Sequence, residues 1–203
     1  MAHRGARVTA VDFSPVALER AREFADRCDV ELETVESDAT ALPRSLDGRF
    51  DLVYANIGAI CWIGDIGAWM EGAAGALVEG GALVLHELHP AVGMFKSVKP
   101  LQFGYPYAFD GPQIESEEGS YADAEAKLEA TESVTYAHSI GEVVGSALAA
   151  GLVIERLDEH TESEFDFWGD GDIELEDDGL WRVRVDGTAF PLFFTLIARK
   201  PTA

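Results

Sequence analysis

The feature that most constrains this sequence is a buried strand at residues 8–11 that ends in an acid and turns directly into a helix. The strand is a short apolar run with alternate β-branched residues. Asp12 follows it, Ser14 can cap the next helix, and Pro15 suits the first helical position. An apolar stripe at helical spacing continues over residues 16–25. This strand–turn–helix unit predicts an α/β domain.

The same alternation recurs along the chain with short connections. Glycines close two of the expected helices: residues 79–81 close the helix at residues 65–78, and Gly151 closes the helix at residues 139–150. Because each strand is followed by a helix, the pattern predicts a parallel sheet covered by helices, with right-handed crossovers. The expected strands are residues 30–35, 50–56, 82–88 and 152–157, and the expected helices are residues 65–78 and 139–150.

Two later regions depart from the alternation. Residues 91–134 combine prolines, aromatics and an acidic run, and we interpret them as an insertion or lid over the carboxyl edge of the sheet. Residues 160–180 form an acidic loop. No helix fits between residues 152–157 and the very apolar final strand at residues 190–199, so these two strands are expected to pair antiparallel. Residues 1–203 are interpreted as one domain.

The charge of the chain is extreme. Its 37 acidic residues outnumber the 15 lysines and arginines, which gives a formal net charge of −22, and lysine is scarce. A polyanion or an anionic membrane would be repelled, so the composition argues against nucleic-acid and membrane partners. An acidic protein of ordinary habitat remains an alternative, but few lysines beside many acids favour adaptation to high salt, where counterions screen self-repulsion.

Location and metal content are also constrained. The N-terminus has no signal-peptide pattern, and no apolar run is long enough to cross a bilayer, so a cytoplasmic protein is expected. Cys28 and Cys61 lie far apart and fit no metal-ligand spacing, which predicts reduced core cysteines and no metal site.

Acids at two strand ends point to a nucleotide-like ligand. At the end of the first strand, Asp12 can accept hydrogen bonds from two ribose hydroxyls, and Phe13 can lie against an adenine ring. Asp38 follows the next strand, between Ser37 and Ala39. An ordinary strand-end acid and a helix cap are the alternatives, and Asp12 alone would also suit NAD.

Taken in order, these elements resemble a class I S-adenosylmethionine-dependent methyltransferase, from its second strand to its last. The resemblance implies that Asp38 accepts from the adenine amino group and that the backbone N–H of Ala39 meets a ring nitrogen. Asn56 and Ile57 would lie beside the methionine moiety and the transferable methyl. The Gly-Gly turn at residues 80–81 is part of the resemblance, and the pair of acids and the antiparallel ending favour S-adenosylmethionine over NAD.

The family's first strand and its Gly-x-Gly loop have no counterpart here. The resemblance implies a Rossmann-like, mostly parallel sheet with an antiparallel last strand, but residues 1–5 cannot hold the usual first strand and glycine loop. The strands at residues 8–11 and 50–56 would then face each other across about two strand spacings, roughly 10 Å. An upstream start or truncated gene is the preferred explanation; direct pairing of the two halves and a strand from a partner chain are the alternatives.

Candidate reactive residues follow the strand at residues 82–88. Methyl transfer mainly requires alignment and exclusion of water. Where a base is needed, the candidates are His89 first, then Glu87 and His86, although a structural role is the alternative for each. Trp62, Tyr105 and Tyr107 could line a pocket for an apolar or cationic acceptor, or simply pack a lid. His138 is expected to cap or orient the following helix.

The sequence therefore predicts an enzyme that transfers a methyl group from S-adenosylmethionine to a small-molecule acceptor, with activity impaired by the missing N-terminal motif. The rival interpretations are a non-catalytic remnant that binds no cofactor and an NAD-dependent oxidoreductase. The identity of the acceptor and the oligomeric state stay open.

Overall fold

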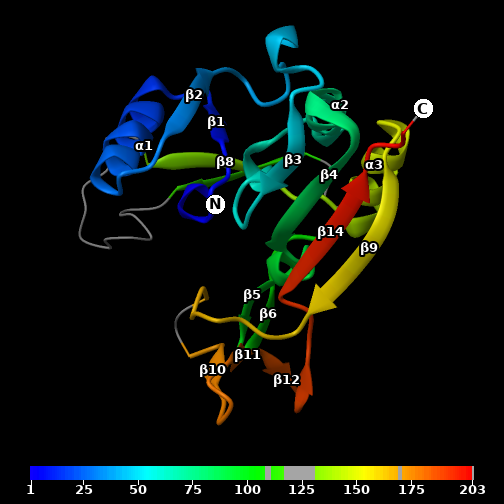
Figure 1. Cartoon of the computed structure of the whole chain (residues 1–203). Helices are drawn as coiled ribbons and strands as arrows, with labels where there is room; N and C mark the ends of the chain where they lie inside the picture. Colours follow the sequence, from blue (N-terminus) through cyan, green and yellow to red (C-terminus); the bar gives the residue numbers. More distant parts are fainter. Residues whose placement is uncertain (108–110, 117–130, 169–170, 203) are drawn as a thin grey trace.

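The computed structural model describes residues 1–107, 111–116, 131–168 and 171–202, and Figure 1 shows the arrangement of their elements. Parts of the predicted lid, residues 108–110 and 117–130, and of the acidic loop, residues 169–170, lie outside the described residues. The elements are β1 (Val8–Asp12), α1 (Pro15–Arg27), β2 (Leu32–Glu36), β3 (Phe50–Ala55), α2 (Ile66–Ala76), β4 (Leu77–Leu88), β5 (Phe95–Val98), β6 (Leu101–Phe103), β7 (Pro112–Ser116), β8 (Glu132–Tyr136), α3 (Ile140–Ala149), β9 (Val153–His160), β10 (Glu174–Leu175), β11 (Trp181–Arg182), β12 (Arg184–Val185), β13 (Thr188–Ala189) and β14 (Phe193–Arg199).

The strands pair as an α/β fold with an antiparallel ending requires. β1 pairs with β2 and β3 with β4, both in parallel. The larger sheet has the order β3-β4-β14-β9, and β14 runs antiparallel to both of its neighbours. The predicted antiparallel pairing of the last two long strands is therefore confirmed, and β14 is inserted between elements that precede it in sequence.

The two parallel pairs are not joined directly. Among the described residues, β1 is hydrogen-bonded only to β2, and β3 only to β4. Direct pairing of the two halves, one of the three explanations for the absent first strand, is therefore not what the structure contains.

Helix α1 begins as its sequence predicts. Ser14 Oγ accepts a hydrogen bond from the Ala17 N–H at 3.2 Å, and proline occupies the first helical position. Leu18 and Ala25 are buried, but Val16 and Phe24 of the same apolar stripe are 57% and 64% exposed. The helix packs on only a two-stranded sheet, so part of its apolar face has no cover.

The main core lies between the four-stranded sheet and helices α2 and α3. Met70 of α2, Val143 of α3 and Leu83, Leu85 and Phe194 of the sheet are almost completely buried there. The strand residues alternate with partly exposed neighbours, because successive side chains of a strand point to opposite faces.

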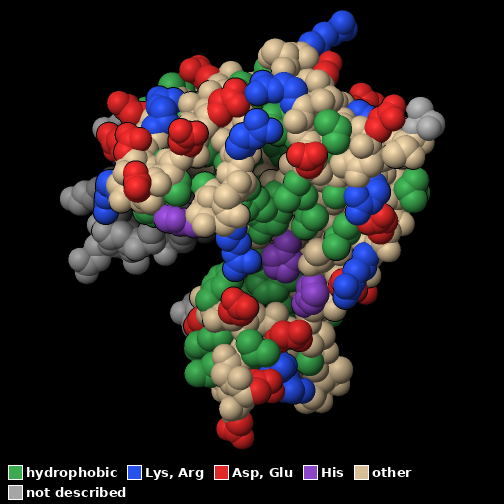
Figure 2. Space-filling model, viewed as in Figure 1, with side chains coloured by type: hydrophobic (Ala, Val, Ile, Leu, Met, Phe, Trp, Pro, Cys, Tyr) green, Lys and Arg blue, Asp and Glu red, His purple; other side chains and the backbone are tan. Residues whose placement is uncertain are grey.

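The opposite face of this sheet carries no helix among the described residues, since α2 and α3 both lie behind the sheet in Figure 1. Figure 2 shows hydrophobic side chains gathered over this part of the molecule, with histidines at the lower edge of the patch. Leu52 and Tyr54 of β3 are 42% and 46% exposed here. The sheet register sets Tyr54 beside Val84 and Val84 beside Ile197 on this face.

The predicted glycine cap at the end of α2 is wrong. The helix ends at Ala76, Leu77 is already extended with φ −71° and ψ 140°, and residues 79–81 belong to β4. Gly80, with φ +76°, instead lies in the irregularity where β4 and β3 shift register.

Groups distant in sequence satisfy the carbonyls at the end of α2. Lys200 Nζ donates to the carbonyl oxygens of Ala74 at 2.9 Å and Leu77 at 2.8 Å. The backbone N–H groups of Gly48 and Arg49 donate to two further carbonyls of the last turn. Because these partners replace a local cap, the helix can enter a strand without a left-handed residue.

The segment predicted as an irregular lid contains regular structure. Its described part forms two antiparallel hairpins, β5–β6 and β7–β8. β5 contributes to a second hydrophobic cluster with residues of the 160–193 region, including Val98, Ile173, Val183 and Phe193. In Figure 1 the short strands β5, β6 and β10–β12 lie together below the main sheet.

One acid of the predicted acidic loop, Asp172, is a buried structural group of this second cluster. It is 4% exposed, and its carboxyl oxygens accept hydrogen bonds from the backbone N–H groups of Val98 at 3.1 Å and Lys99 at 2.9 Å.

None of the helices in the described ranges is long and apolar enough to cross a membrane.

Candidate functional site

The predicted nucleotide-binding acids lie at one edge of the small sheet. β1 and β2 are parallel and in register from Val8 to Asp12, so their carboxyl ends meet. The Ser37 N–H donates to the carbonyl oxygen of Asp12 at 3.0 Å, which fixes the start of the Ser37–Ala39 segment beside the end of β1. The structure therefore brings the two acidic strand ends together.

Each of these carboxylates uses one oxygen to hold its own turn. Asp12 Oδ1 accepts the Ser14 N–H at 2.8 Å. Asp38 Oδ1 accepts the Thr40 N–H at 2.8 Å and the Thr40 hydroxyl at 2.7 Å, and these bonds lower the pKa of Asp38. Within the described part of the chain, Oδ2 of neither acid accepts a hydrogen bond from protein, so both atoms remain for ligand hydroxyl or amino groups.

Phe13 lies beyond Asp12 and is 77% exposed. An exposed aromatic ring next to two carboxylates suits stacking against a heteroaromatic ring better than it suits packing within the protein. Ala39 is half-buried behind this edge, where its neighbour Asp38 is exposed.

The turn after β3 is held by Glu87. Asn56 is exposed and Ile57 half-buried at the carboxyl end of β3. The Gly58 N–H donates to Glu87 Oε1 at 2.6 Å, and the N–H groups of Ala59 and Ile60 donate to Oε2 at 2.9 and 3.2 Å. Glu87 is 4% exposed, so this carboxyl group is committed to the backbone of the turn.

His86 points to the opposite face of β4. Its Nδ1 lies 2.8 Å from Thr195 Oγ1, and His160 Nε2 lies 2.9 Å from the same oxygen. The ring of His86 stacks on Phe193 at 5.5 Å. Burial, followed by the proximity of His160, lowers the pKa of His86.

His89 is 5% exposed, and both of its ring nitrogens have protein partners. Nδ1 accepts the Ala91 N–H at 3.1 Å, so the ring proton lies on Nε2, which donates to Glu159 Oε1 at 2.8 Å. These contacts tie the end of β4 to β9. The three predicted base candidates therefore have three separate environments, and their roles in catalysis stay predictions.

Of the residues predicted to line a pocket for the methyl acceptor, His138 and Tyr107 lie close to the start of α3. His138 is buried and its Nε2 lies 2.7 Å from the carbonyl oxygen of Ile63. Its Nδ1 lies 3.3 Å from Glu142 Oε2 without hydrogen-bond alignment. The Tyr107 hydroxyl accepts the Ile140 N–H at 3.3 Å, so both side chains meet the start of α3. The described polar contact of His138 is therefore to the segment after η3, and its predicted role at the following helix stays a prediction.

Trp62 lies on the short 3₁₀ helix η3 (Ile60–Trp62) and is 57% exposed. β8 packs against η3, and Tyr136 covers Gly64 so closely that an added Cβ would lie 3.0 Å from the Tyr136 ring. Tyr105 instead lies near η4 (Val92–Met94), where its N–H donates to the Gly93 carbonyl oxygen at 3.0 Å.

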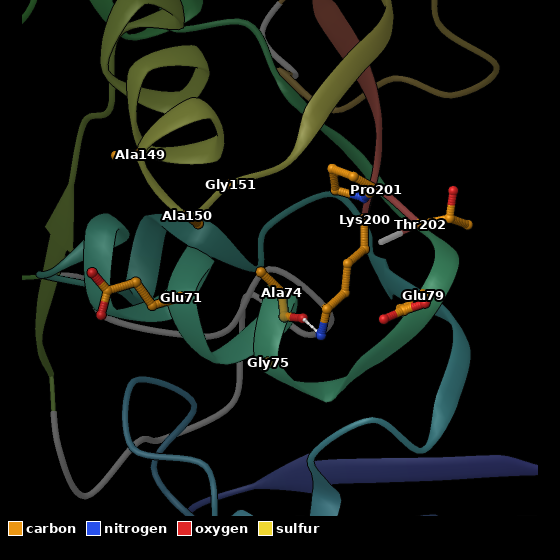
Figure 3. Close-up of a pocket in the computed structure, with 10 residues that line it drawn as sticks. All are labelled: Glu71, Ala74, Gly75, Glu79, Ala149, Ala150, Gly151, Lys200, Pro201 and Thr202. Atoms are coloured by element: carbon orange, nitrogen blue, oxygen red, sulfur yellow. Dashed lines mark hydrogen bonds between the residues drawn. The ribbon is translucent and has the colours of Figure 1, made fainter.

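One hollow of the described surface lies away from these residues. Figure 3 shows Lys200, Glu71 and Glu79 around it, with the Lys200 ammonium turned to the end of α2 rather than into open space. Lys200 follows β14, which is antiparallel to β4, so the hollow is at the edge of the sheet opposite the carboxyl ends of β3 and β4. Ligands of open α/β sheets bind at the carboxyl edge, so this hollow is not the candidate site.

Sequence reasoning missed the partners that define these environments. Thr195, Glu159 and Tyr136 contact His86, His89 and the η3 region from strands far away in the chain. The alternation of β14 places Thr195 on the same face as Phe193 and Ile197, and this isolated hydroxyl in a very apolar strand was the available signal.

The comparisons with known proteins agree with this geometry. Residues 1–81, which include both acids and the turn after β3, match the family model of the methyltransferase domain. No curated protein matches the chain in sequence.

Solved structures share the fold at low identity. An S-adenosylmethionine-dependent methyltransferase from Mesorhizobium loti is 20% identical, with 95% of this chain and 80% of that chain covered and a TM-score of 0.63. For another from Methanosarcina mazei, the identity is 16%, the coverage is 100% and 85%, and the TM-score is 0.65. The [4+2]-cyclase SpnF is 15% identical, with 97% and 67% covered and a TM-score of 0.57.

The sequence match of residues 1–81 and the fold of the described chain agree with each other. By sequence, residues 1–81 resemble the methyltransferase-domain family, and the described chain has the fold of solved S-adenosylmethionine-dependent methyltransferases.

Proposed function

We propose that this enzyme methylates a small-molecule acceptor and holds its cofactor at the carboxyl edge formed by β1, β2 and β3. The observation that carries the proposal is the pair of available oxygens, Asp12 Oδ2 and Asp38 Oδ2, on neighbouring strand ends that are joined by the Ser37 N–H bond. Asp12 would accept from the ribose hydroxyls and Asp38 from the adenine amino group, with Phe13 against the adenine ring.

In this proposal the cofactor supplies the methyl group from its sulfonium, and the chain aligns the acceptor with that methyl and excludes water. Asn56 and Ile57 would border the methionine end from the turn after β3. Trp62, Tyr107 and His138 would form the acceptor side, because η3, β8 and the start of α3 pack together there.

Small-molecule acceptors are favoured by the charge of the chain. With a formal net charge of −22, the surface would repel nucleic acid. Figure 2 shows acidic side chains spread over the visible face rather than a basic patch. The occurrence of the same fold in a cyclase means that the reaction has to be tested directly.

We also propose that a further parallel strand between β1 and β3 completes the cofactor site and that the chain without it binds more weakly. β1 and β3 each have one edge without a hydrogen-bonded strand among the described residues. Leu52 and Tyr54 are exposed beside that edge. Unpaired strand edges and bare apolar faces are costly, so a strand with a covering helix would be strongly stabilised there.

We also propose that the protein functions at high salt and in a reducing compartment. The excess of acids over cations supports function at high salt. The cysteines Cys28 and Cys61 are both free, which supports a reducing compartment such as the cytoplasm.

Calorimetric titration of S-adenosylhomocysteine into this chain, in about 2 M KCl, tests the proposal. We expect micromolar binding that Asp12→Asn and Asp38→Asn each weaken by about tenfold, or about 1.4 kcal/mol. Asp26→Asn, on the exposed side of α1, is the matched control and should leave the affinity unchanged.

If this chain does not bind S-adenosylhomocysteine, titration of an extended chain separates an incomplete site from a non-catalytic remnant. Binding only after the chain is extended by a strand with a glycine-rich loop would support the completing strand. Absence of binding in both the chain and its extended form would refute the methyltransferase function and favour the non-catalytic remnant.

A further inference from the structure

Glu87 is a buried acid whose hydrogen bonds all end on backbone. Beside the three bonds from the N–H groups of residues 58–60, its Oε1 also accepts the Leu88 N–H at 2.8 Å. The side chain thus accepts hydrogen bonds from four N–H groups: three in the turn after β3 and one at the end of β4. Carboxylate oxygens that accept several charge-assisted bonds have little capacity left for a further proton donor.

The turn that Glu87 holds has little regular structure of its own: the Ala59 N–H also donates to the Asn56 carbonyl oxygen at 3.1 Å, whereas the N–H groups of Gly58 and Ile60 depend on Glu87. It leaves β3 at Ala55, passes through Gly58 with φ +80°, and enters the single turn of η3. Successive N–H groups in such a turn point to the same side and form a concave donor surface, which needs an acceptor when it is buried. Glu87 reaches this surface from the adjacent strand β4, 27 to 29 residues away in sequence.

The alternation of side chains along β4 explains why Glu87 is buried close to this turn. Leu83, Leu85 and Glu87 point to the helix-covered face of β4, whereas His86 points to the bare face. The position is therefore a core position occupied by an acid. Burying a carboxyl group is unfavourable unless it is fully hydrogen-bonded, and here the turn supplies the bonds.

We propose that Glu87 is a positioning residue that fixes the turn carrying Asn56 and Ile57 against the cofactor, and that it is not the base of the reaction. This role rests on the proposed function, because it requires that the turn faces the methionine end of the cofactor. Loss of the carboxylate should free the turn while leaving the sheet and the helices intact.

Amide hydrogen exchange measured by NMR tests the first half of this proposal. In Glu87→Gln, the amide group offers one acceptor oxygen in place of two, so the N–H groups of Gly58 and Ile60 should exchange at least about tenfold faster, and that of Ala59, which keeps the Asn56 carbonyl oxygen as an acceptor, less so. Exchange in α3 should be unchanged, which shows that the variant is folded. Glu87→Asp keeps the carboxylate on a shorter stem and should give an intermediate rate.

Cys61 supplies a second, spectroscopic readout within the turn. Its Sγ lies 3.5 Å from the Gly58 carbonyl oxygen, and burial, together with the charge of Glu87, raises the pKa of the thiol to about 11. In a Cys28→Ser background, thiolate absorbance against pH should titrate closer to the ordinary value of 9.0 in Glu87→Gln. Glu79→Gln, an exposed glutamate of the same strand, is the control and should titrate as the parent does.

Affinity for S-adenosylhomocysteine tests the second part of the proposal, that the turn held by Glu87 contributes to cofactor binding. Glu87→Gln should weaken binding by about tenfold or more, and Glu79→Gln should not. Unchanged exchange of residues 58–60 in folded Glu87→Gln would overturn the proposal. Faster exchange with unchanged affinity would overturn the positioning role alone, whereas absence of binding in every chain, wild type included, would overturn the proposed function with it.

Discussion

At the scale of single residues, the end of β4 shows how strand geometry separates neighbouring polar groups. His86 lies on the bare face of the sheet, Glu87 lies among the core residues, and His89 is locked between Ala91 and Glu159. Candidates next to each other in sequence therefore cannot converge on one reacting atom by proximity in the chain alone. The chemistry of the two histidines depends on partners from β9 and β14, and that of Glu87 on the turn after β3.

The His86 cluster should make stability depend on pH. Burial and the nearby His160 lower the pKa of His86 below its ordinary value of 6.5, although Glu87 acts in the opposite direction. The unfolded chain therefore takes up a proton before the folded chain does, so stability present above about pH 6.5 is lost as the pH falls. His86→Gln should reduce this loss in urea unfolding at pH 5.5 and 7.5.

Thr195→Ser is the control for this prediction, because it keeps the hydroxyl that both rings contact. The same loss of stability at low pH in His86→Gln as in the wild type would contradict the assignment of the pH dependence to this ring.

At the scale of elements, the starts of the helices and the predicted Gly151 at the end of α3, with φ +80°, agree with the structure, whereas the predicted end of α2 was wrong. Ser14, Asp65 and Ser139 each accept an N–H from the first turn of their helix, which a local pattern is able to indicate. The end of α2 is satisfied by Lys200 and by a loop before β3, and no local pattern contains that information.

Strands with a clear local pattern were also predicted, and strands without one were not. The runs at β1, β3 and β14 are apolar enough to be recognised, and the lack of a helix between β9 and β14 predicted their antiparallel pairing. The hairpins β5–β6 and β7–β8 were missed because short polar strands have a weak hydrophobic pattern. At the candidate site, Asp12 and Asp38 were indicated by strand ends, whereas Thr195 and Glu159 act through tertiary contacts alone.

Lys200 should stabilise the fold through the end of α2. Lys200→Met keeps most of the apolar stem but removes two charge-assisted hydrogen bonds to helix carbonyls. We expect a loss of about 1–3 kcal/mol in the free energy of unfolding, measured with urea. Lys96→Met, at an exposed position of β5, should change it by less than about 0.5 kcal/mol. Equal effects of the two substitutions would contradict the capping role.

Asp172 should hold the second hydrophobic cluster together. Asp172→Ala leaves the buried N–H groups of Val98 and Lys99 without their acceptor, so we expect a loss of about 2–4 kcal/mol. Limited proteolysis should then cleave within residues 95–103 or 171–190 before the main sheet. Asp177→Ala, on an exposed acid of the same loop, should leave the cleavage pattern unchanged. Wild-type resistance in Asp172→Ala would refute this role.

At the scale of the whole molecule, two properties are shared across the chain. The formal net charge of −22 produces self-repulsion in the compact state. The four-stranded sheet is covered by α2 and α3 on one face and, within the described ranges, carries no helix on the other, where hydrophobic side chains gather in Figure 2. Both properties make stability sensitive to the solvent, since salt screens the charges and strengthens the burial of apolar surface.

The melting temperature should therefore rise by several degrees between about 0.1 M and about 2 M KCl. Sorbitol at matched osmolality is the control, because it does not screen charge. A melting temperature that is independent of KCl, or that rises equally in sorbitol, would contradict the role of net charge.

The central claim is that the carboxyl edge of β1, β2 and β3 holds the cofactor. The most direct test is titration of S-adenosylhomocysteine into the isotopically labelled chain while backbone amide shifts are followed by NMR. We predict that the largest shift changes occur at residues 12–14, 37–40 and 56–60. Changes centred instead on the hollow around Lys200, or no changes at saturating ligand, would contradict this assignment.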